Sequence, residues 1–368
     1  MRLTRRSMAI GLAAMGAGRA RAQSRSPAVR ATPVVRDLQN PWSLAFLPDG
    51  AMLVTERPGR LRLVPPGGAT TSIDGVPAVW ARGQGGLLDV CLHPDFASNR
   101  LVYLSYAAAT PEGAATRVAR ARLQGTTLAE PTPIFEAGPR IANNFHFGCR
   151  LAFDRAQRLY ATIGERYSWR DEAQNLADLR GKVVRLMPDG AVPPDNPFVG
   201  RGGTRPEIFS YGHRNPQGLA MHPETGAMWC HEHGPRGGDE VNVLRAGGNF
   251  GWPRATHGVD YSGAVISEHK TLPGMVDPIW VWVPSIAPSG MAFCTSSVYP
   301  GWRGSLFIGA LAGRLLVRLE LDGERVVREE RLLERQIGRI RDVRQGPDGR
   351  IYVVTDSDEG AVLRLDPV

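Results

Sequence analysis

Short runs of alternating apolar and polar residues recur along the chain. In each copy an apolar run leads into a turn with Pro, Asp or Gly, and a second apolar run then ends near an acidic residue, as at 42–56 and 149–165. The two-residue period and the turn residues predict a β-hairpin for every copy. Six copies are present, and their anchor residues are Leu44, Leu88, Leu151, Leu219, Met291 and Val343.

The spacing of these hairpins predicts the fold class. Successive anchors are about 44 to 72 residues apart, and a four-stranded propeller blade needs about 40 residues. The wider gaps contain Pro/Gly-rich segments at 188–205 and 252–277, which we expect to be loops on one face. The chain is therefore predicted to be an all-β, six-bladed β-propeller of four-stranded antiparallel blades around a central channel. Two packed β-sandwiches are the alternative.

The first 22 residues predict an export signal. They have a basic start, a short apolar run and the small residues of a cleavage site at 20–22. The pair Arg5 and Arg6 resembles a twin-arginine signal, with an ordinary secretory signal as the alternative. The apolar run is too short to span a membrane, so we expect a periplasmic protein without stable membrane insertion.

The domain boundaries follow from this signal and from the repeats. Residues 1–22 are the predicted signal, residues 23–32 are a linker, and residues 33–368 form a single propeller that is the catalytic domain.

Composition argues against a nucleic-acid partner. The formal charge is +8, but five arginines lie within the signal and their loss leaves +3. The remaining basic residues are nearly all arginines scattered among acids, with Lys182 and Lys270 the only lysines. The four cysteines are far apart and lack paired metal-ligand spacing, so buried free thiols are expected, although export would permit a disulfide.

Two adjacent polar segments, 211–218 and 231–240, carry candidate chemistry. They place Arg214 and an amide beside a glycine-rich turn that ends in Asp239 and Glu240. Arginine binds planar carboxylates in a two-pronged fashion, and carboxylates are oxygen ligands that calcium prefers. A polar loop between strands and a zinc pair at His231 and His233 are the alternatives.

His146 is the candidate base. It lies immediately before the first strand of the third repeat, where the entry loop of a blade would overhang the channel. His93 and His222 precede prolines in the hairpin turns, and we interpret both as structural.

Five motifs together resemble the soluble pyrroloquinoline-quinone-dependent aldose sugar dehydrogenases. The similarity runs in order over residues 36–367 and is greatest for the bacterial periplasmic branch, with soluble glucose dehydrogenase more distant. That family is a six-bladed propeller, in agreement with the repeat count. The motifs lie at 83–96, 146–153, 212–218, 232–240 and 339–343.

The resemblance implies a site for pyrroloquinoline quinone, a flat ortho-quinone with three carboxylates. It implies that Arg214 and Asn215 contact the quinone oxygens, that Gln84 lies beside the cofactor, and that Arg339 and Arg341 hold its carboxylates. Without the other motifs, this arginine pair would be interpreted as a solvated strand face opposite carboxylates of a neighbouring blade. The remaining implied cofactor contacts are Tyr261, Ala312 and Arg314.

The resemblance also implies calcium. The backbone carbonyls of Gly234 and Pro235 match ligands of a calcium ion that the cofactor shares, and Glu240 matches a ligand of a further calcium, with Phe250 in the same metal set.

Two positions depart from the family pattern. Ala312 replaces a lysine that would contact the cofactor, and Arg314 is the candidate substitute. Phe145 replaces the acidic residue of the glucose dehydrogenases, so a narrow preference for glucose is not expected.

The reaction implied by the resemblance is hydride transfer from an aldose sugar. His146 would remove the proton of the C1 hydroxyl, Arg214 and calcium would stabilise charge on the quinone oxygen, and Glu165 would orient the base. The product would be a lactone, and the electrons would pass to an unidentified acceptor. A calcium-dependent lactonase or esterase is the alternative enzyme, and a non-catalytic binding propeller is the third interpretation. The arginines expected in the channel favour the quinone, and the sequence leaves the oligomeric state open.

Overall fold

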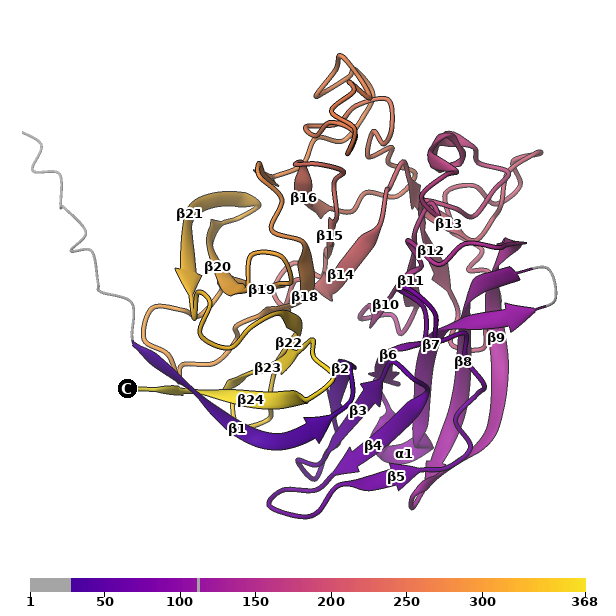
Figure 1. Cartoon of the computed structure of the whole chain (residues 1–368). Helices are drawn as coiled ribbons and strands as arrows, with labels where there is room; N and C mark the ends of the chain where they lie inside the picture. The colour runs from indigo at the N-terminus through magenta and orange to yellow at the C-terminus, as the bar shows by residue number, and fades with distance from the viewer. Residues whose placement is uncertain (1–27, 111–112) are drawn as a thin grey trace, which may run out of the picture.

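Six four-stranded sheets surround a central axis in the computed structural model, which describes residues 28–110 and 113–368 (Figure 1). Neighbouring strands within each sheet are antiparallel wherever a register is defined. Each of the six predicted anchors lies in the innermost strand of a different sheet. The prediction of a six-bladed propeller is thus confirmed, and the predicted export signal lies outside the described residues.

The blades follow one another in sequence order, each beginning with its innermost strand. The first three blades are β2 (Pro41–Phe46), β3 (Met52–Glu56), β4 (Arg60–Val64) and β5 (Thr71–Ile73); β6 (Leu87–Leu92), β7 (Leu101–Thr110), β8 (Gly113–Gln124) and β9 (Thr127–Ile141); and β10 (Gly148–Phe153), β11 (Leu159–Ile163), β12 (Lys182–Leu186) and β13 (Ile208–Tyr211). The next two are β14 (Pro216–Met221), β15 (Met228–Glu232), β16 (Asp239–Val243) and β17 (Trp280–Trp282); and β18 (Pro288–Phe293), β19 (Leu306–Ala310), β20 (Leu315–Asp322) and β21 (Arg325–Leu332).

The sixth blade closes the ring with the beginning of the chain. It consists of β22 (Ile340–Gln345), β23 (Ile351–Thr355), β24 (Gly360–Pro367) and, as its outermost strand, β1 (Val29–Leu38). β1 and β24 are antiparallel, with Val29 opposite Pro367. The predicted linker at 23–32 is therefore wrong for residues 29–32, because backbone pairing with β24 makes them part of the propeller.

The hydrophobic core is divided among the contacts between blades. Six clusters of buried apolar side chains each join two neighbouring blades, and the innermost strands contact one another in ring order until β22 meets β2. A seventh cluster, which includes Trp42 and Phe147, packs beside the axis between the first three blades. Because every blade is buried on both faces, the innermost strands keep fixed positions around the axis.

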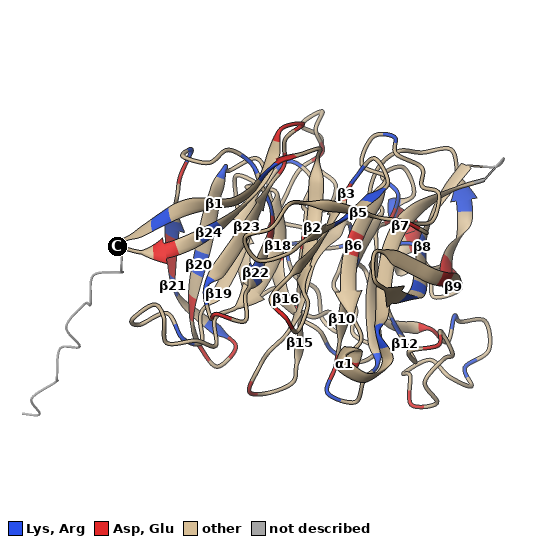
Figure 2. Ribbon diagram, turned by 90° about the horizontal axis from the view of Figure 1, so that it is seen from below, with Lys and Arg blue, Asp and Glu red and all other residues tan. Residues whose placement is uncertain are grey.

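Helices contribute little to the described residues, which contain α1 (Phe96–Asn99) and the 3₁₀ helix η1 (Arg170–Gln174). The segments 188–205 and 252–277 lie outside regular elements, as predicted. All four cysteines are free, and Cys149, Cys230 and Cys294 are buried. No helix within the described part of the chain is long and apolar enough to cross a membrane. Basic and acidic residues are interspersed along the strands and loops of the blades (Figure 2).

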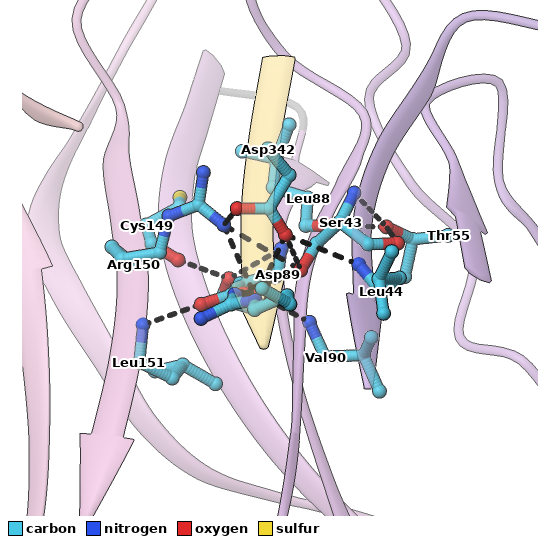
Figure 3. A network of polar contacts seen from close by, with 12 residues as sticks. Ser43, Leu44, Thr55, Leu88, Asp89, Val90, Cys149, Arg150, Leu151 and Asp342 are labelled. Carbon is cyan, nitrogen blue, oxygen red and sulfur yellow. Dashed lines mark hydrogen bonds and ion pairs between the residues drawn. The ribbon is translucent and has the colours of Figure 1, made fainter. Parts of the chain in front are cut away.

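A network of charged and polar side chains joins the innermost strands of several blades (Figure 3). Arg150 from β10 lies 3.0 Å from Asp342 of β22 and 3.3 Å from Asp89 of β6, and all three side chains are buried. Arg344 adds contacts of 3.0 Å to the same two carboxylates. Ser43 of β2 donates a hydrogen bond to Asp89 at 2.5 Å. Four blades are therefore tied together at the centre of the molecule.

Candidate active site

A cavity of about 630 Å³ lies at one end of the axis, where the innermost strands begin. Side chains and backbone from all six blades line it, including Trp42, Gln84, Phe147, Asn215, Ala287 and Arg341. In every blade the pairing of the innermost strand with the second strand changes register near this end. Such bulges redirect side chains beside active sites, so the fold supplies a pocket to which distant parts of the sequence contribute.

His146 lies just before β10 and is held from two directions. Its Nδ1 is 2.8 Å from Oε1 of Glu165, the second residue after β11. Its backbone N–H donates to Oε1 of Gln84 at 2.8 Å. The residue has a φ of 50°, and its ring packs edge-on against Tyr167 at 5.4 Å between centroids. The imidazole is therefore buried and oriented, with Nδ1 directed at the carboxyl group.

The environment favours the uncharged forms of this pair. Burial, together with the positive charges of Arg214 and Arg166, lowers the pKa of His146 well below its ordinary value. Burial raises the pKa of Glu165 to about 8, although the same two arginines act in the opposite direction. The imidazole is thus neutral at neutral pH, as a general base requires.

Arg214 and Asn215 directly precede β14, and their backbone lies beside Glu165, the partner of His146. The Arg214 carbonyl accepts the backbone N–H of Glu165 at 2.8 Å, and its guanidinium donates to the carbonyl of Gly234 at 2.7 Å. Nε of Arg214 is buried without a partner. Asn215 lines the axial cavity, and its side-chain oxygen accepts the N–H of Gly148 at 3.3 Å. Tyr261 is 58% exposed with its ring centroid 5.9 Å from the guanidinium, which places it at the outer edge of this group.

Arg341 lies in β22 and Arg339 directly precedes that strand. The two arginines differ in how freely their guanidinium groups can bind a ligand. Arg341 lines the axial cavity, donates to Oε1 of Gln217, and stacks 4.8 Å above Trp42, while its buried Nε has no partner. Burial lowers its pKa to about 10, so it stays charged at neutral pH. Arg339 also lines the cavity, but it is exposed and pairs with Asp356 of the same blade at 2.8 Å. Arg341 is therefore the better cation for an anionic ligand.

Arg214 and Arg341 both lie near His233, because Nη1 of Arg214 donates to the His233 carbonyl at 3.1 Å and Arg341 lines the axial cavity together with His233. Burial and then Arg341 lower the pKa of His233 to about 3, and Arg214 and His146 act in the same direction. His233 lines the axial cavity and a smaller cavity beside it, which Arg214 also lines. The structure therefore brings the three residues together at the same end of the axis rather than on separate surfaces.

The smaller cavity gathers most of the predicted metal residues. Gly234, Glu240 and Phe250 line it together with Glu232, and its volume of about 10 Å³ suits a single water-sized occupant. Burial and the neighbouring Glu232 raise the pKa of Glu240 well above its ordinary value. Pro235 does not line this cavity, and its carbonyl lies 3.5 Å from the Ser285 hydroxyl. The donors here are oxygens, which fits a hard cation.

The described residues do not supply the ligands that the alternative zinc site at His231 and His233 would need. Nε2 of His233 donates to the carbonyl of Pro288 at 2.6 Å, so it is not free to bind a metal. Among residues 28–110 and 113–368, no group of three or more His, Cys, Asp and Glu side chains is placed to hold a metal ion.

Ala312 and Arg314 do not lie at the axial cavity. They line another cavity with Pro284 and Arg331, and this cavity shares no lining residue with the axial one. The turn after β19 thus places Arg314 at a cavity other than the axial one, and its role as a substitute cofactor cation stays a prediction. Leu311 is the residue of this turn that lines the axial cavity.

Several residues of the site were not identified from the sequence. Trp42, which forms part of the cavity wall, follows the first residue of β2 and is stacked between Arg341 and Arg150, the latter 4.2 Å from its ring. Glu232 accepts hydrogen bonds from the backbone N–H of Arg214 and, at 2.8 Å, from Nδ1 of His213. Trp42 and the predicted cofactor residue Arg341 each stand two residues before an anchor. This shared position in the repeat is a sequence signal that could have identified Trp42 as a site residue.

Comparison with known proteins identifies the family. The glucose/sorbosone dehydrogenase family profile matches residues 38–364. The aldose sugar dehydrogenase YliI of Escherichia coli (strain K12) is 46% identical over 350 residues, which cover 93% of this chain and 94% of that protein.

Two solved structures agree with this match. The soluble aldose sugar dehydrogenase of Escherichia coli in its apo form superposes with a TM-score of 0.90 at 44% identity, covering 92% of this chain and 100% of that one. The PQQ-bound aldose sugar dehydrogenase of Streptomyces coelicolor gives a TM-score of 0.77 at 31% identity, covering 93% and 100%. The predicted resemblance is confirmed, and the chain belongs to the glucose/sorbosone dehydrogenase family as a sugar dehydrogenase.

Proposed function

We propose that this protein is a quinoprotein that oxidises the C1 hydroxyl of aldose sugars to lactones with pyrroloquinoline quinone and calcium. The observation that carries the proposal is the His146–Glu165 pair, 2.8 Å apart, beside an axial cavity lined by Arg341, whose guanidinium Nε has no partner. The relative of known structure with bound PQQ and the aldose sugar dehydrogenase YliI support it.

The cavity has the groups that a flat tricarboxylate needs. Arg341 lines the cavity and keeps a buried Nε without a partner, and Arg214, which lines the smaller cavity beside it, also has a buried Nε without a partner. The ring of Trp42 offers a flat surface. Asn215 adds an amide at the same wall. Arg341 would therefore hold a carboxylate, and Arg214 and Asn215 would contact the quinone oxygens. Pyrroloquinoline quinone supplies, when bound, the electrophilic quinone carbon that accepts the hydride.

Calcium is assigned to the oxygen-lined region beside the cavity. The carbonyls of Gly234 and Pro235 are the proposed ligands of the calcium ion that the cofactor shares. Glu240 is the proposed ligand of a further calcium at the small cavity, which Gly234 and Phe250 also line. The Gly234 carbonyl already accepts a hydrogen bond from Arg214. A carbonyl oxygen has a second lone pair, so this bond leaves room for a cation.

His146 performs the proton step. In this proposal Nδ1–H donates to Oε1 of Glu165, so the neutral ring presents Nε2 as the acceptor for the proton of the C1 hydroxyl. The proton goes to Nε2 while the C1 hydride leaves the sugar, so the hemiacetal loses two electrons and becomes a lactone. Arg214 holds positive charge where negative charge develops. We place the protein in the periplasm on the basis of residues 1–22, with an electron acceptor still to be identified.

The proposal is tested by reconstituting the purified apoprotein with pyrroloquinoline quinone and calcium and following reduction of a redox dye by several aldoses. Dye reduction that requires the quinone, calcium and a sugar is the expected result. Hydrolysis of a lactone without dye reduction by any sugar would instead establish the lactonase. If the protein showed neither activity, the non-catalytic binding propeller would be the remaining interpretation.

His146→Ala tests the assigned base. The variant should bind the quinone as the unmodified protein does, because the arginines remain, and its turnover should fall by roughly 10²–10⁴-fold. His222→Ala is the matched control, since His222 lies in a hairpin turn away from the cavity. Turnover equal to that of the control would remove His146 from the reaction.

A further inference from the structure

Arg166 is a buried cation that the proposed reaction does not use. It follows Glu165 directly, is 3% exposed, and keeps its charge at neutral pH because burial lowers its pKa only to about 10. Its hydrogen-bond acceptors are backbone carbonyls rather than carboxylates. A buried arginine with only carbonyl acceptors holds in place the chain segments to which those carbonyls belong.

Two of the three acceptors belong to the segment that carries His146. Nε of Arg166 donates to the carbonyl of Phe145 at 2.9 Å, and Nη2 donates to the carbonyl of Asn143 at 2.5 Å. Nη1 donates to the carbonyl of Ala114 in β8 at 2.8 Å. The guanidinium therefore fastens the His146 segment to the second blade as well as to the third.

The same segment also holds Arg166 in return. The side-chain amide of Asn143 donates to the carbonyl of Arg166 at 2.9 Å, and its oxygen accepts the N–H of Phe145 at 2.6 Å. The guanidinium lies 4.0 Å from the centroid of the Phe147 ring. Residues on both sides of His146 are thus held by one side chain.

The backbone at this point needs such support. His146 has a φ of 50°, and Arg166 and Tyr167 have φ values of 69° and 65°. Residues other than glycine keep left-handed conformations only where their surroundings hold them. Tyr167 packs against the imidazole, so relaxation of this turn would also move the ring's neighbour.

We propose that Arg166 is a positioning residue that fixes the imidazole of His146 by holding the carbonyls of Asn143 and Phe145. This inference rests on the proposed role of His146 as the base. It also requires the fork of an arginine, because the guanidinium donates from three separate nitrogens to carbonyls on two blades, whereas all three donors of a lysine ammonium lie on one nitrogen.

The test compares Arg166→Lys and Arg166→Met in the holoprotein, alone and combined with His146→Ala. Arg185→Met is the matched control, since Arg185 is buried in the same blade, stacks 5.1 Å from Phe209, and donates to the Asp195 carbonyl at 2.8 Å away from the cavity. Both Arg166 variants should lower kcat about 10²-fold, with KM for the aldose and Kd for the quinone unchanged. The control should retain its kcat.

The double variant separates positioning from general damage. If Arg166 acts through His146, Arg166→Met should not lower the residual turnover of His146→Ala any further. An equal loss in both backgrounds, or an equal loss of kcat in the Arg185 control, would overturn the proposal.

A measurement on the apoprotein does not depend on sugar oxidation. In proton NMR spectra the Nδ1–H of His146, hydrogen-bonded to Glu165, should give a protected signal that both Arg166 variants lose and the Arg185 control keeps. An unchanged signal in both Arg166 variants would refute the positioning role whatever the activity. Loss of the signal in a protein that oxidises no sugar would refute the proposed function and leave the positioning role standing.

Discussion

At the residue scale, the chemistry depends on one imidazole and one carboxyl group that share a buried site. His146 and Glu165 are 19 positions apart and their side chains meet at 2.8 Å. Both were predicted from the sequence, His146 from its place before an innermost strand and Glu165 from the resemblance to the aldose sugar dehydrogenases. Their distance and burial could not be predicted, because these depend on how two strand ends approach across the third blade.

Glu165→Gln should change the pH dependence of stability in the apoprotein. The folded state raises the pKa of Glu165 from 4.5 to about 8 by burial, so it binds the proton more tightly than the unfolded chain does. Unmodified protein should lose stability as pH rises from about 4.5 to 8, and glutamine removes that loss. The variant should therefore be more stable at pH 8, by an amount on the order of 3 kcal/mol, and of equal stability near pH 4.

Urea unfolding of both proteins across this pH range measures the difference. Glu359→Gln, at an exposed loop, is the control and should leave the profile unchanged. A stability gain from Glu165→Gln that is the same at pH 4 and pH 8 would contradict the assigned environment.

Single residues also mark what the sequence could not place in space. Arg314 was expected to replace a cofactor cation, yet the turn that carries it directs it to another cavity. Trp42 was not singled out, because a tryptophan within an apolar strand is usually a core residue. The direction of a side chain at a turn or bulge depends on local φ and ψ, which the apolar period does not report.

At the scale of elements, the beginnings of the innermost strands form the site. Every innermost strand changes register with its neighbour near the cavity. The hairpins and their turns could be predicted from alternation alone, whereas a bulge shifts one residue without a clear sequence signal. Close packing of two backbones at such a point can require glycine.

Gly164→Ala should disturb the His146 segment. A methyl group at Gly164 would overlap the carbonyl oxygen of His146 and approach Oδ1 of Asn215 at 3.0 Å. The overlap is with backbone, so the segment must move, at an expected cost of about 1–3 kcal/mol in stability and a larger loss in kcat than in quinone affinity. Thermal unfolding and single-turnover kinetics measure the two effects.

Gly202→Ala provides the comparison, because nothing lies within 4 Å of a methyl group there and its φ is not left-handed. It should be neutral or slightly stabilising. Equal effects of the two substitutions would show that the approach of Gly164 to His146 is not important.

At the scale of the whole molecule, ring closure and the axial charges hold the blades in register. β1 completes the sixth blade from the opposite end of the chain. The repeat count predicted the number of blades, but strand β1 carries no repeat and its first four residues resembled a linker. The axial residues Ser43, Arg150 and Asp342 each stand one position before an anchor, whereas Asp89 stands one position after its anchor Leu88, so the sequence spacing alone does not group the four residues.

Asp342→Asn should destabilise the ring. Asp342 is fully buried and contacts Arg150 and Arg344, each at 3.0 Å, so the substitution leaves buried positive charge incompletely paired. We expect a loss of about 3–5 kcal/mol. Asp322→Asn, in an exposed pair with Arg325, should cost no more than about 1 kcal/mol.

Chemical denaturation of the two variants measures their free energies of unfolding. Similar losses for the buried and the exposed aspartate would contradict a structural role for the axial charges.

Sugar oxidation by a bound quinone with His146 as the base is tested most directly by the absorbance spectrum of the protein reconstituted with pyrroloquinoline quinone and calcium, recorded before and after addition of an aldose. We expect the oxidised quinone spectrum of the unmodified protein to change to that of the reduced cofactor. In His146→Ala the same quinone should bind and its spectrum should persist. A spectrum that sugar does not change in the unmodified protein would refute quinone-dependent sugar oxidation, and a change at the same rate in His146→Ala would refute the role of His146.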